Sequence, residues 1–166
     1  MTAEALQKTR TYAYPRPIAR TPEVRALTGL ELLRKQLVGE LPKPPIAATL
    51  DFRLVEVEEG RVVFEGEPSD FVLNPSGIVH GGYGAAILDS ALGCAVQSML
   101  PSNVGFTTVE LKVNYVRAIR PGEGRIRAEG RIVHAGNNLL TAEGSIVRLS
   151  DGKLAAHATT TCMALR

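Results

Sequence analysis

One carboxylate is isolated in an apolar stretch of the chain, because Asp89 is the only fixed charge between Ile78 and Leu100. Its neighbours are Ala, Gly, Leu, Ile, Cys, Val and Met, which are apolar nearly all the way round a helix, as in helices buried in a core. A buried acid without a partner either costs several kcal/mol or has its pKa raised until it is neutral. Asp89 is therefore a candidate catalytic group.

A second candidate group precedes the same helix, which is expected to run from about Gly81 to Met99. The residues His80, Gly81 and Gly82 stand at its start, where the first N–H groups have no partner within the helix. Glycine allows a ligand to approach these amides, and the positive end of the helix favours negative charge. They could therefore hold a carbonyl oxygen on which charge develops. The alternative is that the glycines only form the turn into the helix.

The spacing of these two groups predicts a dimer. Gly81 and Asp89 are separated by roughly 12 Å along a helix, so one chain cannot bring both to one carbonyl. If they act together, Asp89 comes from a second copy in a two-fold dimer with two equivalent sites. The alternating strand over 106–116 is a plausible seam along which two sheets join.

The rest of the chain predicts an α+β fold in which a curved antiparallel sheet of about six strands wraps the long helix. Alternation with period two begins at Ala48, with a hairpin turn at Glu59-Gly60. Thr28 and Glu31 have capping-box spacing and predict a short helix up to Gly39. The prolines that follow predict an extended connection, and the later strands are expected over 106–116, 124–135, 138–149 and 153–165.

Residues 1–27 predict an N-terminal arm, and residues 28–166 a single domain. The arm has three prolines among scattered arginines, which is typical of a poorly ordered terminus; a transit peptide and an arm that clasps a neighbouring subunit are the alternatives. The remaining chain is nearly neutral, which argues against a nucleic-acid surface. The arm lacks an apolar signal segment, and Asp89 argues against a membrane span over 78–100. Cys94 and Cys162 are expected to be reduced thiols, so we expect a cytoplasmic protein.

A known family shares the pattern formed by these residues. The chain has Asn74, Gly77, His80-Gly81-Gly82 and Asp89 at the spacings of that family's signature. In this respect it resembles the hotdog-fold acyl-CoA thioesterases of the phenylacetate-degradation type. The resemblance extends from about Thr28 to the end, and includes the segment 107–115 and the Arg-Pro-Gly turn at 120–122. It implies a hotdog fold and a homodimer with sites at its interface, paired into a tetramer.

The resemblance also implies a reaction, the hydrolysis of an aryl- or medium/long-chain acyl-CoA. The Gly81 N–H would polarise the thioester carbonyl, and Asp89 of the other subunit would be the nucleophile or the general base. Asn74 and His80 would orient the thioester or water, and a strand hydroxyl, best matched by Thr108, would hold the acid. No cofactor or metal is implied, since CoA is part of the substrate. The expected substrate contacts are Gly82, Tyr83, Phe106 and Thr107.

Two other functions remain open at this stage. One is a non-catalytic protein of the same fold that binds acyl-CoA. The other is a hydratase that acts on enoyl-CoA, although the Asp and His motif of that branch is not found in the chain. The identity of the acyl group cannot be read from the sequence, because apolar linings discriminate poorly between aryl and aliphatic groups.

Overall fold

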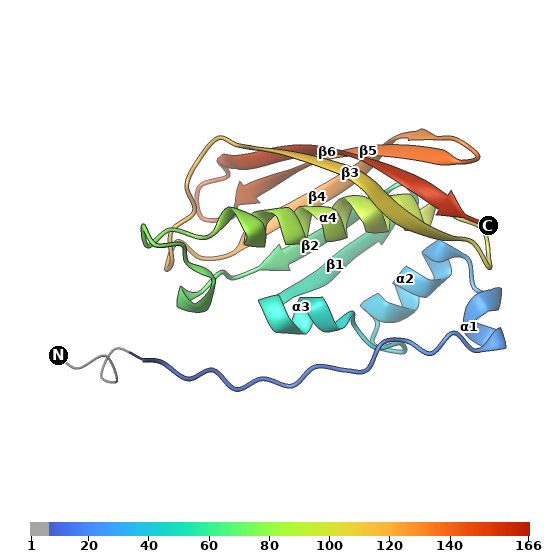
Figure 1. The fold of residues 1–166 in the computed structure, drawn as a ribbon, viewed down its shortest axis with the longest axis horizontal. Coiled ribbons are helices and arrows are strands. Elements are labelled where there is room, and N and C mark those ends of the chain that lie inside the picture. Colours follow the sequence, from blue (N-terminus) through green and yellow to red (C-terminus); the bar gives the residue numbers. More distant parts are fainter. Residues whose placement is uncertain (1–6) are drawn as a thin grey trace.

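Six antiparallel strands form one curved sheet, and a single long helix lies against its concave face (Figure 1). The computed structural model describes residues 7–166. The order across the sheet is β1-β2-β4-β5-β6-β3. The predicted α+β fold is confirmed, and the elements of the sheet and the long helix are β1 (Phe52–Glu58), β2 (Arg61–Gly66), α4 (Gly81–Ser98), β3 (Gly105–Tyr115), β4 (Ile126–Ala135), β5 (Leu139–Arg148) and β6 (Leu154–Leu165).

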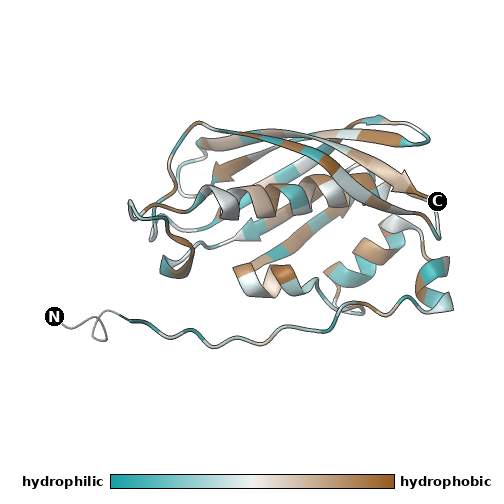
Figure 2. Ribbon diagram, viewed as in Figure 1, coloured by the Kyte–Doolittle hydropathy of each residue, from teal (hydrophilic) through white to brown (hydrophobic). Residues whose placement is uncertain are grey.

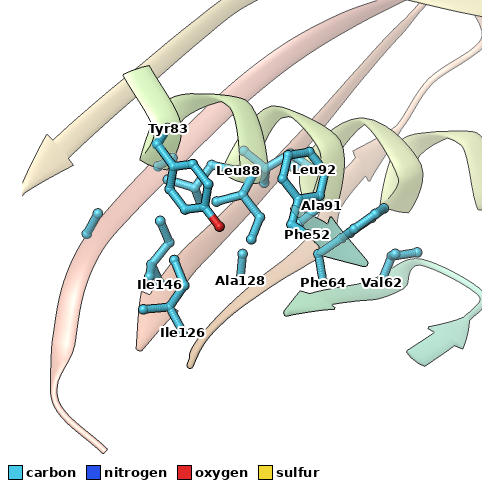
Figure 3. Close-up of a cluster of buried hydrophobic side chains, with 14 of the residues drawn as sticks. Phe52, Val62, Phe64, Tyr83, Leu88, Ala91, Leu92, Ile126, Ala128 and Ile146 are labelled. Atoms are coloured by element: carbon cyan, nitrogen blue, oxygen red, sulfur yellow. The ribbon is translucent and has the colours of Figure 1, made fainter. Parts of the chain in front are cut away.

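The long helix α4 is held by close contact with the sheet. Ile87, Leu88 and Leu92 are completely buried in the hydrophobic core. Figure 3 shows Leu88 and Leu92 pointing from α4 into this cluster. Where helix and sheet approach most closely, a Cβ on Gly130 of β4 would lie only 2.5 Å from the Ala91 carbonyl oxygen. Small residues on both elements therefore let the curved sheet wrap the helix backbone. Within residues 7–166, no helix is long and apolar enough to cross a membrane.

The strands follow the alternation expected from the sequence. Figure 2 shows hydrophobic and hydrophilic segments following one another along the strands, as expected when one face of a sheet is buried. The predicted hairpin at Glu59-Gly60 joins β1 to β2, and Gly60 has the positive φ of 73° that favours glycine in such a turn. The register of β1 with β2 is thus set by a local turn.

Strand β3 lies at one edge of the sheet, although it precedes β4 in the sequence. It pairs along its whole length with β6, from Gly105 opposite Leu165 to Tyr115 opposite Ala156, with a bulge between Thr108 and Glu110. Among the described residues no strand pairs with its other side. The strand predicted as a seam is therefore an open edge that runs beside α4 (Figure 1).

Three short helices precede the sheet. The helix predicted from the capping box is confirmed as α2 (Gly29–Leu37), with Thr28 and Glu31 bonded in both directions. The connection is non-helical up to Pro44, but the strand alternation expected from Ala48 is wrong, because α3 (Pro45–Leu50) is helical there and β1 begins only at Phe52. Proline at the first helical position loses no intrahelical bond, so Pro45 begins a helix instead of preventing one. Pro22 does the same for α1 (Pro22–Ala26), inside the predicted arm.

The described part of the arm ahead of α1 is extended and contacts the body at few points (Figure 1). Arg10 lies over the ring of Phe71, with 3.6 Å from its guanidinium carbon to the ring centre, and donates to the Thr49 carbonyl oxygen at 2.6 Å. Lys8 pairs with Asp70. Asp70 and Phe71 belong to η2 (Asp70–Val72), a short 3-10 helix before the loop into α4. Residues 1–6 of the predicted arm lie outside the described residues.

Candidate active site

Helix α4 begins with a cap made by His80. The Nδ1 atom of His80 accepts a hydrogen bond from the Gly82 N–H at 2.8 Å, so the other ring nitrogen, Nε2, carries the proton in the neutral form. A Cβ on Gly82 would lie 2.9 Å from that Nδ1 atom. Glycine at this position therefore keeps room for the cap, and the Gly82 amide is already engaged.

The first amide of the helix is left for another acceptor. Among the described residues no acceptor is found for the Gly81 N–H, which is one of the donors that a helix start leaves unpaired. The Gly81 carbonyl oxygen accepts a hydrogen bond from the Tyr115 hydroxyl. A Cβ on Gly81 would lie 3.2 Å from the Tyr115 ring. Strand β3 thus fixes the backbone of Gly81 while its N–H stays free.

Asn74 shapes the loop that leads into this helix start. Its Oδ1 atom accepts from the Ser76 N–H at 2.9 Å and the Ile78 N–H at 3.3 Å. The turn closes at Gly77, whose φ is 74° and whose N–H donates to the Asn74 carbonyl oxygen. A side chain would be strained at that φ, which explains glycine at this position of the motif. The Asn74 side-chain amide nitrogen remains as a donor.

These residues border a pocket of about 400 Å³, which we call the larger pocket. Asn74, His80 and Gly81 form one side of it, and Gly84 lies on the same helix face. The opposite wall comes from Tyr115 and the segment that follows β3. The remaining residues that line the pocket are Ile78, Val79, Val116, Arg117, Ala118, Ile119, Ile146 and Ala156. The structure therefore brings three predicted site residues, Asn74, His80 and Gly81, to one hollow.

Asp89 lies at the middle of α4 and is half-buried. The Thr108 hydroxyl on β3 donates a hydrogen bond to its Oδ1 atom at 2.9 Å. Of the two neighbouring threonines, Thr108 is thus the one that faces the acid, while Thr107 is exposed. One oxygen of the carboxylate is oriented by this bond, and the other is left for a water or a substrate.

The chain therefore carries two separate groups, which we call the amide half (Asn74, His80 and Gly81) and the acid half (Asp89 and Thr108). They are separated by roughly 12 Å along α4. Strand β3 touches both, since Tyr115 contacts Gly81 and Thr108 contacts Asp89. One chain does not bring the two halves to a common point.

The four expected substrate contacts do not line the larger pocket. Tyr83 is 3% exposed, and its ring points from α4 toward the sheet among the core side chains (Figure 3). Phe106 packs over Gly93, where a Cβ would lie 3.1 Å from its ring. Gly82 and Thr107 are exposed. Of these four, Tyr83 is the one that packing removes from any surface where a substrate could bind.

Cys94 lies one and a half turns beyond Asp89 and is a free thiol. Burial and, after it, the nearby Asp89 carboxylate together raise the pKa of this thiol to about 12. Cys162, opposite Thr108 on β6, is also free, and burial raises its pKa. Both sulfurs are thus protonated at neutral pH and are poor nucleophiles. Asp89 is thus the candidate reactive group of the acid half.

Sequence reasoning did not identify Tyr115 as a residue of this pocket. Tyr115 contacts Gly81 across 34 positions of the chain, which no local spacing reveals. Arg117 lies in the pocket wall and donates to the Leu154 carbonyl oxygen at 2.8 Å. The one available signal was the alternation of β3, which places Tyr115 on the same face as Leu111 and Val113.

Comparisons with known proteins agree with this fold. The family model of the thioesterase superfamily matches residues 76–155, which include α4 and β3. The crystal structure of a phenylacetic acid degradation-related protein from Ralstonia eutropha JMP134 has a TM-score of 0.72 and 32% identity, over 79% of this chain and 98% of that one. The chain belongs to the thioesterase superfamily, and its fold is the hotdog fold of these enzymes.

Two further relatives extend the comparison. A Streptococcus mutans UA159 protein, solved bound to acetyl-CoA, has a TM-score of 0.63 and 26% identity, over 69% of this chain and 89% of that one. A protein of Halobacterium salinarum, provisionally named an esterase, is 39% identical over 65 residues. That match spans 38% of this chain and 41% of the relative.

Proposed function

We propose that this protein hydrolyses an aryl- or medium/long-chain acyl-CoA thioester to the free acid and CoA. The observation that carries the proposal is the pair of groups on α4, the free Gly81 N–H at its start and the Asp89 carboxylate held by Thr108. Thioester hydrolysis needs a donor for the developing oxyanion and an activated water or nucleophile. The thiolate of CoA leaves readily, so a strong general acid is not needed.

The reaction follows from these positions. Water attacks the carbonyl carbon and gives its proton to Asp89, or the Asp89 carboxylate attacks directly and water then cleaves the mixed anhydride. In both routes the carbonyl oxygen becomes negative beside the Gly81 N–H, the carbon–sulfur bond breaks, and the thiolate takes up a proton. A single turnover in heavy-oxygen water tests the nucleophile route: label in Asp89 shows that an anhydride formed and that water cleaved it at the Asp89 carbonyl carbon. The general-base route places the label only in the product acid.

His80 and Asn74 act in this proposal from the side of the larger pocket. His80 presents its Nε2–H while its Nδ1 atom keeps the helix capped, and Asn74 presents its side-chain amide. Both are donors, and they can orient the thioester or the water. Gly82 contributes through the cap, because its N–H is bonded to His80.

A complete site requires a second copy of the chain, paired through β3. Val109 and Tyr115 are more than half exposed on this edge strand, and an unpaired apolar edge favours association. Glu110 and Lys112 are both exposed and two positions apart, on one face. If two copies pair antiparallel with Leu111 opposite Leu111, each Glu110 lies opposite a Lys112. This register lays the Thr108 end of one strand over the Tyr115 end of the other.

That dimer would bring the acid half of each copy to the amide half of the other, and so would contain two equivalent sites. The proposal draws support from the relatives, because one of them is provisionally named a thioesterase and described as related to phenylacetic acid degradation, and another was solved with acetyl-CoA. These descriptions concern those proteins, and for this chain they favour a CoA thioester as the substrate. Pairing of such dimers into a tetramer is a further expectation.

The first experiment is the change Asp89→Asn, assayed by thiol release from a panel of acyl-CoA substrates. We expect kcat to fall by about three orders of magnitude or more, because the activating carboxylate is lost while the shape stays. The matched control is Glu143→Gln, an exposed acid on β5 far along the chain from both halves. Full activity in Asp89→Asn would refute the role of this residue, and acyl-CoA binding without turnover by the unaltered protein would refute the proposed reaction.

The second experiment tests the shared site. Chains with Asp89→Ala are mixed with chains carrying Gly81→Val, which places a side chain against the Tyr115 ring. Each parent is expected to be inactive. A mixed dimer contains one site with both halves intact, so mixing should restore activity, up to about a quarter of the original when exchange is random. No recovery after proven exchange would contradict a site built from two copies.

A further inference from the structure

Tyr115 ends the edge strand β3 and reaches the first turn of α4. Its hydroxyl donates a hydrogen bond to the Gly81 carbonyl oxygen, and its ring lines the larger pocket. A Cβ on Gly81 or on Gly84 would lie 3.2 Å from atoms of this ring. Because the two glycines are three positions apart, they lie on one face of the helix. The ring therefore packs directly against the helix backbone, in space that side chains at these two positions would take.

The peptide group between Gly81 and Gly82 is held at both of its ends. Its carbonyl oxygen accepts a hydrogen bond from Tyr115, and its N–H donates to the Nδ1 atom of His80 at 2.8 Å. A peptide group that accepts and donates at the same time is polarised, so each bond strengthens the other. The two bonds thus form a chain that runs from the edge strand through this peptide group to the imidazole ring.

This chain of bonds fixes two groups of the amide half. The bond to Nδ1 orients the His80 ring and leaves the proton on Nε2. The free N–H of Gly81 belongs to the preceding peptide group, and the two peptide groups meet at the Gly81 Cα atom, so a tilt of one turns the other. Glycine has no Cβ that would limit such a tilt. A bond from another element is therefore needed to keep the Gly81 N–H in one direction.

The Tyr115 hydroxyl is suited to be a constant donor. Burial raises the pKa of this phenol above its ordinary value of 10, and the backbone of Ala85 opposes the effect only in part. The phenol is therefore protonated at neutral pH. Water could also donate to the Gly81 carbonyl oxygen, but Tyr115 is held in the sheet opposite Ala156 of β6, so its hydroxyl stays in one place.

We propose that Tyr115 is a positioning residue of the amide half, which acts through the Gly81–Gly82 peptide group on the His80 ring and on the Gly81 N–H. This inference rests on the proposed thioesterase function and adds to it a residue from a different element of the fold. Tyr115 need not touch the thioester for this role. Its hydroxyl should matter when the carbonyl oxygen becomes negative, and little when the substrate binds.

The first test is Tyr115→Phe, which keeps the ring against both glycines and removes the hydroxyl. Loss of this one hydrogen bond should lower kcat about 3- to 10-fold, while KM changes by less than about twofold. Tyr14→Phe is the matched control, because it removes the same hydroxyl from an exposed ring of the arm, and it should leave both constants unchanged. An unchanged kcat in Tyr115→Phe, or a change confined to KM, would overturn the proposal.

The second test is spectroscopic and does not depend on catalysis. Nitrogen NMR distinguishes the two neutral forms of an imidazole ring. In the unaltered protein we expect the His80 proton on Nε2 alone. In Tyr115→Phe both neutral forms should be populated, and the Gly82 amide proton should shift upfield because its hydrogen bond weakens. Unchanged signals of His80 and Gly82 would contradict the chain of bonds.

The same signals separate this inference from the proposed function. If the unaltered protein hydrolyses no thioester, the proposed function fails, whereas the signals of His80 and Gly82 still decide whether Tyr115 holds the helix start. If the protein is active and these signals move in Tyr115→Phe without any change in kcat, the hydroxyl orders the helix start but does not position it for the reaction, and the proposal is wrong.

A double-mutant cycle tests whether the place of the hydroxyl matters. Gly84→Ala puts a methyl group 3.2 Å from the Tyr115 ring, so the ring must move by a few tenths of an ångström and carry its hydroxyl with it. This change should lower kcat about twofold or more when Tyr115 is present. Combined with Tyr115→Phe, it should have little further effect, because the two changes act through one bond. Effects that multiply would show that Gly84 and Tyr115 act independently, and would overturn the proposal.

Discussion

The hydroxyl of Thr108 donates a 2.9 Å hydrogen bond to Oδ1 of Asp89, and this bond joins the edge strand β3 to the middle of α4. It orients the only carboxylate of an otherwise uncharged helix. Since β3 is also the strand that we expect to form the dimer seam, the same element positions the acid and presents it to the second copy.

Replacing Thr108 tests this bond directly. In Thr108→Val the shape is kept and the donor is lost, so we expect kcat to fall about 10- to 100-fold, as for loss of a hydrogen bond to a charged group. Thr108→Ser keeps the donor and should retain most of kcat. Steady-state kinetics on one good substrate measures both. Equal activity of the valine and serine variants would show that the bond does not matter for the reaction.

His80 is predicted to have two separable roles, one in the helix and one in the reaction. His80→Ala removes the cap on the Gly82 N–H and should cost about 1 kcal/mol of stability, which lowers Tm by about 2–4 °C for a chain of this size. His80→Asn restores a good capping residue and should restore Tm. If His80 also orients the thioester, the asparagine variant stays slow despite its recovered Tm.

Thermal unfolding and kinetics on the same samples separate the two roles of His80. Recovery of both Tm and kcat in His80→Asn would mean that capping is the whole contribution of this residue. Recovery of neither would mean that the ring packs in a way that asparagine cannot replace.

The proposed register of the seam predicts a charge-swap result. Lys112→Glu replaces two attractive pairs per dimer with two repulsive ones, and since each cross-strand pair is worth about 0.2–1 kcal/mol, the dimer Kd should rise about tenfold. Glu110→Lys should do the same. The double variant Glu110→Lys with Lys112→Glu restores the pairs and should return Kd to its original value. Sedimentation at low salt measures all three, and failure of the double variant to recover would exclude this register.

A pH effect is expected from the ion pairs of Arg148, which fix a wall of the larger pocket. Arg148 is bonded to Glu123 and Asp151, at 2.9 and 2.5 Å, and so joins the segment after β3 to the β5–β6 hairpin. The hydrogen bond from Arg148 is the main cause that lowers the pKa of Asp151 from 3.8 to about 2. A carboxylate with a lowered pKa stabilises the fold fully above its unfolded pKa and loses this effect as the pH falls toward the folded value.

The unaltered protein should therefore lose stability between about pH 4 and pH 2, over and above the loss from other acids. Arg148→Met removes the ion pairs and should flatten Tm against pH in this window, while lowering Tm at neutral pH. Asp151→Asn serves as the control for the pair itself. Parallel curves for the unaltered protein and Arg148→Met would contradict the assignment.

Much of the fold could be predicted because its signals are local. The isolated Asp89, the glycines before α4 and the alternation of the strands each depend on a few neighbouring residues, and the helix, the hairpins and the capping box were found where they were predicted. Helix α3 was missed because Pro44 and Pro45 are also typical of an extended chain, whereas here Pro45 begins a helix. The same prolines fit an extended segment and the first turn of a helix, and tertiary packing decides between the two.

The site was predictable in its parts but not in its surroundings. Thr108 and Asp89 were paired through the resemblance, and the structure places them in contact. Tyr83 was expected at the substrate, whereas the rotation of α4 turns its ring into the core. The place of Tyr115 beside Gly81 depends on a contact between distant segments, which spacing along one chain does not contain.

The order of the strands has a consequence for the synthesis of the chain. Strand β3 leaves the ribosome before β4, β5 and β6, yet among the described strands its one neighbour is β6, which is made after the other five. Until β6 emerges, β3 has no strand of this sheet to pair with, and pairing over such separations is slow. The Thr108 hydroxyl would thus reach its place beside Asp89 only at the end of folding, so loss of the last strand would remove the acid half of the site first.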